Sequence, residues 1–432
     1  MANPSVLATG VMNDYNVSSN QNGAISQVDS TGAVHAGVVT EINNDKFTSH
    51  DARVLNFLNN SAYKALVVDY YYSVKSVYGV FDPTVAGTWT LNPNKYFSSD
   101  GSAGNNWQTS NPYSIVTNGN DMYIMGYDQN TIVKIDMTSY TYTSTFYTYT
   151  PLAGKTGHGV DMDKVTIAGT DYIAALFIND DGSYANYGDS QLVILDFSGK
   201  TINTCNLNAN ANSLNIGINS DTGDPCAYVT SYGGPQNAGG NNGSPYTSEL
   251  QIVDLKQNKI LQTIGPKTTP VDAGDYIDVA LVGSDAYVLT ANANDEYTQY
   301  AYRLTKAPQA SLLKGTFDGN STYTATVESG ATWLLAYDGA VLWFVAGKLV
   351  YTIDTAVDMS STALTLRANA NDHSSDSQGL GISTAYGQLN TASVVIPYSA
   401  AAGVSRSAVS GGHTKFAKIM LPREILKKFG KA

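Results

Sequence analysis

The chain has 432 residues, of which only 14% are charged, against about 25% in an average globular protein. Its net charge of −12 argues against a nucleic-acid partner, because binding to phosphates needs clustered lysine and arginine side chains. No stretch approaches the roughly 18 consecutive apolar residues of a transmembrane helix, so we expect no transmembrane segment.

The composition also bears on where the protein resides. Low charge combined with loops rich in Asn, Ser and Thr is common among secreted and surface proteins. The first four residues, Met1-Ala2-Asn3-Pro4, lack the basic start and apolar run of a signal peptide. Either the chain is cytoplasmic or its leader has been removed. The composition favours the second alternative, so we expect an extracytoplasmic protein (secreted, periplasmic or on the cell surface) whose leader has been removed.

Short segments of strand character follow one another along the chain. They are rich in aromatic and β-branched residues, or they alternate polar and apolar residues. In chain order the clearest of them are residues 24–29, 34–39, 53–58, 63–72, 113–117, 122–125, 131–136, 140–150, 213–218, 227–230, 249–254, 260–264, 333–337 and 341–345. The pattern predicts an all-β protein.

An aspartate at the end of a strand recurs at intervals of 50 to 60 residues. Its carboxylate can accept hydrogen bonds from backbone N–H groups two residues on, so we interpret it as a structural turn residue. The seven markers are Asp29, Asp82, Asp136, Asp196, Asp254, Leu304 (where the aspartate is missing) and Asp354. Each interval holds about four strands, which predicts a seven-bladed β-propeller of four-stranded antiparallel blades in residues 1–405.

Closing such a ring requires the two ends of the chain to share one blade, which also removes an open sheet edge. We expect residues 24–29 and 34–39 to supply its two outer strands and residues 379–384 to supply its inner strand. Two segments, 6–12 and 394–398, compete for the second strand, and the sequence does not choose between them.

Two stretches resemble a known repeat. The segment AYVTSYGG…SELQIVDLKQNKILQTI is similar to the YVTN-type β-propeller repeat, and MYIMGYDQNTIVKIDMTSYTYTSTF is a looser copy. The resemblance implies a seven-bladed propeller. It implies no particular activity, because members of that family are mostly binding proteins or proteins without an assigned role.

The chain has two cysteines, Cys205 and Cys226. An extracytoplasmic pair invites a disulfide. The predicted strands place the two residues toward opposite faces of neighbouring blades, whereas a bridge needs Cα atoms within about 7 Å. Two buried free thiols are the alternative.

A propeller has two faces, which we distinguish here by their connections. On the loop face each inner strand begins and the loops between second and third strands open; the strand-ending aspartates lie on the opposite, turn face. Three of the five histidines fall in loops of the loop face, where they could converge with carboxylates on a divalent or transition metal. The predicted metal site consists of His50, His158, His373 and Asp376. The segment NDDGS at 179–183 also resembles part of a calcium loop, although the spaced ligands of an EF-hand are absent.

Long loops on the same face are where propellers usually carry binding sites. The predicted ligand-binding residues are Tyr184, Tyr232, Tyr297, Trp107 and Asp275. No GxSxG elbow, P-loop, HExxH or dinucleotide fingerprint is present, which favours a binding protein over an enzyme. The expected partner is a protein, a glycan or a small molecule. A metal-dependent enzyme or redox protein is the alternative, and a structural surface-layer component is a third.

The last part of the chain, residues 406–432, has the opposite charge to the rest. From residue 413 onward it contains six basic residues and one acidic residue, interspersed with apolar ones. We expect this tail to be a short helix against the propeller or a disordered extension, with contact to an anionic surface or a partner as the alternative.

Overall fold

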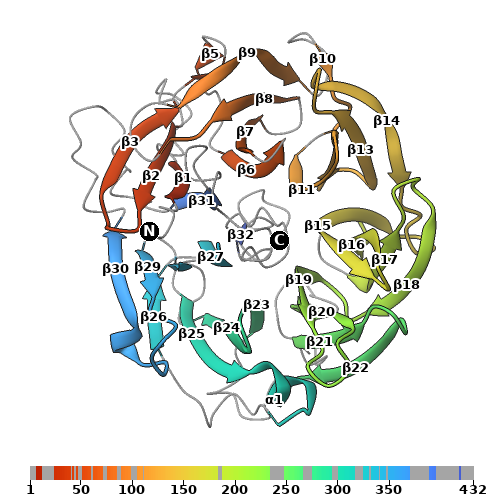
Figure 1. The fold of residues 1–432 in the computed structure, drawn as a ribbon, viewed down its shortest axis with the longest axis vertical. Helices are drawn as coiled ribbons and strands as arrows, with labels where there is room; N and C mark the ends of the chain where they lie inside the picture. Colours follow the sequence, from red (N-terminus) through yellow and green to blue (C-terminus); the bar gives the residue numbers. More distant parts are fainter. Residues whose placement is uncertain are drawn as a thin grey trace.

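A computed structural model shows seven β-sheets arranged side by side around a central axis (Figure 1). It describes residues 6–11, 24–39, 41–42, 45–46, 51–59, 62–71, 75–84, 89–98, 105–109, 111–182, 187–233, 248–265, 275–293, 300–316, 325–329, 332–339, 341–346, 349–369, 389–395 and 418–419. The protein is a seven-bladed β-propeller, as the repeated strand-ending aspartates predict. No helix in these residues is long and apolar enough to cross a bilayer.

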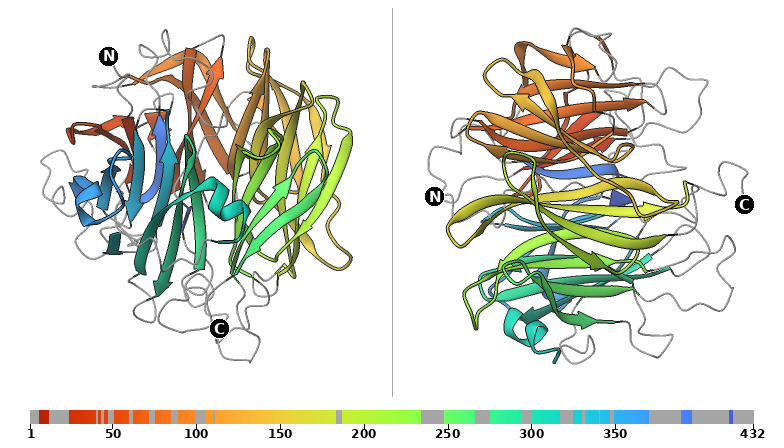
Figure 2. Two further views of the ribbon diagram at one scale, coloured as in Figure 1. Left: turned by 60° about the horizontal axis from the view of Figure 1, so that its bottom comes forward. Right: turned by 90° about the vertical axis from the view of Figure 1, so that its right-hand side faces the viewer.

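The blades follow one another in chain order, each running from an inner strand outward (Figures 1 and 2). The first four are built from β31 (Leu389–Val395), β1 (Val6–Val11), β2 (Ala24–Asp29) and β3 (Val34–Val39); β6 (Asp51–Asn59), β7 (Ala62–Tyr71), β8 (Lys75–Asp82) and β9 (Thr90–Ser98); β11 (Pro112–Asn118), β12 (Asp121–Gly126), β13 (Thr131–Asp136) and β14 (Thr141–Thr148); and β15 (Thr156–Ile167), β16 (Thr170–Asp180), β17 (Gly188–Leu195) and β18 (Thr201–Leu207).

The remaining three blades repeat this plan. Their strands are β19 (Ala211–Ile218), β20 (Pro225–Ser231), β21 (Glu249–Asp254) and β22 (Lys259–Ile264); β23 (Asp275–Val282), β24 (Asp285–Ala293), β25 (Tyr300–Pro308) and β26 (Ala325–Ser329); and β27 (Thr332–Tyr337), β28 (Leu342–Ala346), β29 (Leu349–Ile353) and β30 (Leu364–Asn369). Small additional elements are β4 (Glu41–Ile42) with β5 (Asp45–Lys46), β10 (Asn105–Asn106) parallel to β9, α1 (Gln309–Leu313) and η1 (Ser361–Ala363).

The two ends of the chain close the ring in the first blade. β1 pairs antiparallel with both β2 and β31, so residues 6–11 are the second strand and residues 389–395 the inner one. The prediction of 379–384 as the inner strand is therefore wrong; those residues lie outside the described ones. The inner strand is selected by its pairing with β1, a contact between opposite ends of the chain that local sequence does not show.

One short strand comes from the basic tail. Lys418 and Ile419 form β32, which pairs with Trp333 and Thr332 on the inner strand of the seventh blade. The rest of residues 406–432 lies outside the described residues, so the predicted short helix or disorder stays a prediction.

The hydrophobic core lies between neighbouring blades, where the faces of two sheets pack together. Between the third and fourth blades, for example, Tyr123 and Ile132 pack with Phe177 and Val193. Period-two alternation puts one set of side chains into each of the two interfaces that flank a blade. Cys205 and Cys226 are buried free thiols, so no disulfide joins them. Burial raises the pKa of the Cys226 thiol to about 11.

The strand-ending aspartates are turn residues, as expected. In five blades the carboxylate accepts a hydrogen bond from the N–H two residues on, at 2.6 to 2.9 Å. The five carboxylates belong to Asp29, Asp136, Asp196, Asp254 and Asp354.

Two of these turns predict how stability depends on pH. The Thr138 N–H holds the pKa of Asp136 below its usual 3.8, and the Ser198 hydroxyl does the same for the pKa of Asp196. A carboxyl group whose pKa is lower in the folded state stabilises the fold above its unfolded pKa and loses that contribution as pH falls through the folded pKa. We therefore expect the doubly substituted Asp136→Ala, Asp196→Ala protein to lose less stability than wild type below pH 3.8, measured by urea unfolding at a series of pH values.

The control for this experiment is Asp358→Ala, because Asp358 is exposed and lies outside these turns. Its acid profile should match that of the wild-type protein. Identical slopes for the double variant and wild type below pH 3.8 would show that these turns carry no acid-sensitive stability.

In the fourth and fifth blades, the turn before the outer strand also lies against the outer strand of the preceding blade. Asn258, in the turn between β21 and β22, donates a hydrogen bond from Nδ2 to the carbonyl oxygen of Thr204 on β18, at 3.0 Å. Gly199, in the turn between β17 and β18, has φ +88°, and a Cβ there would lie 2.4 Å from the Phe146 carbonyl oxygen of β14. Such contacts engage backbone groups that an outermost strand would otherwise present to another chain.

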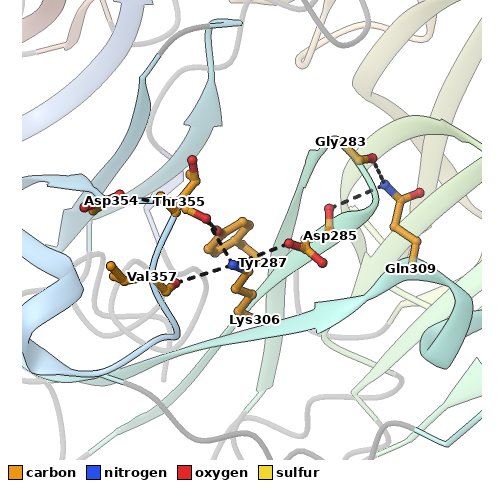
Figure 3. A network of polar contacts seen from close by, with 9 residues as sticks. Gly283, Asp285, Tyr287, Lys306, Gln309, Asp354, Thr355 and Val357 are labelled. Carbon is orange, nitrogen blue, oxygen red and sulfur yellow. Dashed lines mark hydrogen bonds and ion pairs between the residues drawn. The ribbon is translucent and has the colours of Figure 1, made fainter.

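On the turn face, the sixth and seventh blades are joined by a half-buried lysine (Figure 3). Lys306 Nζ donates to the carbonyl oxygen of Thr355 at 3.0 Å and to that of Val357 at 3.4 Å. It also lies 3.4 Å from the Asp285 carboxylate and 6.0 Å from the centre of the Tyr287 ring. Because Lys306 of the sixth blade contacts backbone groups that follow β29 of the seventh, we interpret this network as a structural link between the two blades.

Candidate functional site

A buried histidine and aspartate lie at the loop face of the fourth blade. His158, near the start of β15, is 4% exposed, and Asp180, at the end of β16, is fully buried. His158 pairs with Ile178 across the hairpin, so Asp180, two residues further on, presents its side chain on the same face of the sheet. The separation between His158 Nε2 and Asp180 Oδ2 is 3.3 Å.

The other ring nitrogen of His158 faces the third blade. Nδ1 lies 2.9 Å from the carbonyl oxygen of Tyr127, the residue that follows β12. Since a carbonyl oxygen can only accept, Nδ1 is the donor and carries a hydrogen. This bond sets the orientation of the ring and directs Nε2 toward Asp180.

Two tyrosine rings continue from this histidine. The Tyr127 ring is stacked on the imidazole of His158, with centroids 5.0 Å apart, and Tyr113 packs on Tyr127 at 4.7 Å. Both tyrosines are partly exposed, whereas the histidine is buried. These three rings, which we call the aromatic stack, bridge the third and fourth blades at the loop face.

The end of β16 that carries Asp180 is rigidly held. The Asp180 carboxylate accepts the N–H of Gly182 at 2.7 Å through Oδ1. Its neighbour Asn179 donates from Nδ2 to the hydroxyl of Tyr149 and to the carbonyl oxygen of Asp189, both at 2.8 Å. Burial raises the pKa of Tyr149, so its hydroxyl stays protonated within this network.

Carboxylates on the inner strands link blades around the central axis. Asp161 of β15 accepts from the Ser114 hydroxyl of β11 at 3.3 Å, and from the Leu214 N–H of β19 at 3.2 Å. Two blades later, Asp278 accepts from the hydroxyl of Ser213 at 2.9 Å. All four side-chain partners, Ser114, Asp161, Ser213 and Asp278, follow an irregularity in strand register at the same place in their blades. This recurrence indicates that Asp161 and Asp278 have architectural roles.

Among the predicted metal ligands, only His158 belongs to the described residues. His50, His373 and Asp376 lie outside them, so the convergence of the four stays a prediction. Within the described part of the chain, no three His, Cys, Asp or Glu side chains come together as a metal site. The predicted calcium loop is described only up to residue 182.

The predicted ligand-binding residues do not form one cluster where the structure describes them. Trp107 is fully buried between the second and third blades, stacks on Tyr78 and donates its indole N–H to the Tyr140 carbonyl oxygen at 3.0 Å. Tyr232 is buried in the core of the sixth and seventh blades. The backbone of Asp275 begins β23. Tyr184 and Tyr297 are outside the described residues.

Sequence reasoning missed Tyr113, Tyr127 and Asp180 as members of a site. Asp180 was visible in the NDDGS segment, but as part of a loop rather than as a partner of His158. Tyr113 and Tyr127 flank the inner hairpin of the third blade, at positions where aromatic residues are ordinary strand residues. Only the packing of the third blade against the fourth distinguishes these two tyrosines from other aromatic strand residues.

No known protein family and no curated protein matches the chain. Solved structures similar to it include a functionally unknown protein from Desulfotomaculum acetoxidans, at TM-score 0.43 and 12% identity, covering 84% of this chain and 96% of that one. Another is apo AztD from Citrobacter koseri, at TM-score 0.38 and 10% identity, covering 85% and 97%. A third is the dihydro-heme d1 dehydrogenase NirN in complex with DHE, at TM-score 0.39 and 10% identity, covering 76% and 55%. Membership of the YVTN-repeat family stays a prediction.

Proposed function

We propose that this β-propeller is an extracytoplasmic binding protein whose ligand contacts the aromatic stack on the loop face. The observation that carries the proposal is the arrangement of Tyr113 and Tyr127, partly exposed and layered over a buried histidine. Partly exposed aromatic rings offer large contact areas at low conformational cost, which suits packing against a ligand. The rigid blades beneath hold the rings in place before the ligand arrives.

The surroundings of the stack favour some ligand classes over others. Asp128, next to Tyr127, is exposed, and the chain as a whole is acidic, so an anionic ligand would meet repulsion. Tyrosine faces attract cations and the C–H faces of sugar rings. The ligand classes best matched are therefore a neutral glycan, a cationic small molecule or a protein side chain of these kinds.

A defined set of probes tests this proposal. Wild-type protein is screened against a glycan array and against small cationic compounds by thermal shift, and every hit is repeated with Tyr127→Ala. We expect Tyr127→Ala to weaken binding by about tenfold or more, because it removes the central ring of the stack. Tyr142→Ala, on the outer strand of the same blade, should leave binding unchanged.

The same screen separates the aromatic stack from the residues predicted by sequence. If Tyr127→Ala binds every probe as tightly as wild type while Tyr184→Ala or Tyr297→Ala does not, the ligand site lies at the long loops instead. If no substitution changes the affinity for any probe that binds, the loop face is not the binding surface.

A metal-dependent enzyme or redox protein remains the second candidate function. The observation that favours it is the orientation of His158, whose Nε2 is directed at the Asp180 carboxylate rather than at solvent. Imidazole together with carboxylate is a ligand set for zinc, manganese or iron.

A further inference from the structure

We propose that His158 Nε2 and Asp180 Oδ2 supply two ligands to one divalent transition-metal ion. This inference rests on the second candidate function and does not depend on ligand binding at the aromatic stack. It replaces Asp376 by Asp180 as the carboxylate partner of His158, because the Asp180 carboxylate lies beside the ring.

The positions of the hydrogens at this pair are constrained by its neighbours. His158 Nδ1 donates to the Tyr127 carbonyl oxygen, so in the neutral imidazole the lone pair is on Nε2. Asp180 Oδ1 is engaged by the Gly182 N–H at 2.7 Å, which turns Oδ2 toward the ring. With the imidazole in this neutral form, two atoms that both carry lone pairs face each other in a buried site.

The contact between these two atoms is not a hydrogen bond. Although they are 3.3 Å apart, neither Nε2 nor Oδ2 meets the geometry of a hydrogen bond to the other, and Oδ2 is fully buried with no hydrogen-bond donor among the residues that the structure describes. A buried carboxylate oxygen left in this way has lost its hydration without gaining a hydrogen bond in exchange, which destabilises the fold. A cation placed between the two atoms would remove that destabilisation.

The separation matches the edge of a metal coordination polyhedron. Ligands about 2.0 to 2.1 Å from zinc, at a tetrahedral angle, lie roughly 3.4 Å from each other. The bond from Nδ1 to a backbone carbonyl is also the usual second-shell contact of a metal-bound histidine. Since no third His, Cys, Asp or Glu of the described residues joins the pair, we expect water at other positions and exchangeable binding.

The chain contains a second histidine–aspartate pair that serves as a matched control. His35 Nε2 lies 3.8 Å from Asp29 Oδ2 in the first blade, and the His35 side chain is 28% exposed. Asp29 Oδ1 accepts the N–H groups of Thr31 and Ala33 in its own turn, much as Asp180 Oδ1 accepts that of Gly182, so the two pairs differ in separation and in the exposure of the histidine. The geometry of this second pair predicts no metal site.

Metal binding by the full-length protein tests the proposal. Protein freed of metal with EDTA and dialysed is titrated with Zn²⁺ and Co²⁺, followed by calorimetry and by the Co²⁺ absorption spectrum. We expect one metal ion per chain, a rise in the unfolding temperature on metal addition, and affinity at least about tenfold lower in His158→Ala and Asp180→Asn. His35→Ala should bind as wild type does.

Two further variants separate loss of metal binding from loss of folding and from loss of ligand binding. Asp180→Asn retains the oxygen that accepts the Gly182 N–H, so it should stay folded even if His158→Ala does not. Tyr127→Ala keeps the backbone carbonyl and should still bind metal, which separates this site from the ligand site. The proposal is overturned if wild type binds neither metal, if Asp180→Asn binds both equally well, or if NMR shows that a proton on Nε2 occupies the gap.

Discussion

Replacing Asp161 by alanine should destabilise the protein by about 3 to 5 kcal/mol. The Asp161 carboxylate accepts hydrogen bonds from Ser114 of the third blade, from the Met162 N–H of its own strand and from the Leu214 N–H of the fifth blade. Asp161 is 6% exposed, so water cannot readily replace its carboxylate as the acceptor of these hydrogen bonds. The alanine variant would leave these donors buried, and it would loosen the packing of three inner strands.

Urea unfolding of Asp161→Ala and of the control Asp136→Ala measures this effect. Asp136 also accepts two backbone N–H groups, but its turn is exposed, so its loss should destabilise the protein much less than the loss of Asp161. The stability of Asp161→Asn should lie between those of wild type and Asp161→Ala. Its amide oxygen can still accept a hydrogen bond, but its NH2 group is a donor and would face other donors. Equal stabilities of Asp161→Ala and Asp136→Ala would mean that the inner strands do not depend on this carboxylate.

Substitution of Gly199 by alanine should cost about 3 kcal/mol or more. The residue has φ +88°, which alone disfavours a side chain, and its Cβ would lie 2.4 Å from the backbone oxygen of Phe146. Because the obstacle is backbone of the neighbouring blade, relief requires the turn between β17 and β18 to move away from β14.

Gly169 offers a matched control for this substitution. It has φ +83°, in the turn between β15 and β16, but a Cβ there meets nothing within 4 Å. Gly169→Ala should therefore show only the backbone penalty of about 1 to 2 kcal/mol. The difference between the two alanine variants, measured by thermal or urea unfolding, is the cost of separating two blades; a difference near zero would contradict the close contact.

The repeating part of the fold was predictable because it depends on neighbours in the chain. Asp29, Asp136, Asp196, Asp254 and Asp354 each bind an N–H only two residues away. Such turns, together with period-two alternation, are local chemistry that one sequence displays. The number of blades and the shared first blade follow from counting these units.

The inner strand of the first blade was not predictable in the same way. Residues 379–384 and 389–395 both have strand character, and only the pairing of β31 with β1 decides between them. A contact between residues near the two ends of the chain leaves no signature in local composition. The competition between 6–12 and 394–398 was unresolved for the same reason.

The sequence by itself determined the strands, their turns and the seven repeats, since these arise from residues close together in the chain. Only the tertiary structure decided which side chains and backbone groups of neighbouring blades contact each other. Ser114 meets Asp161 across 47 residues, and His158 meets the carbonyl of Tyr127 across 31, through the packing of separate sheets. A candidate site built from such contacts, including Asp180 beside His158, exists only once the blades are placed side by side.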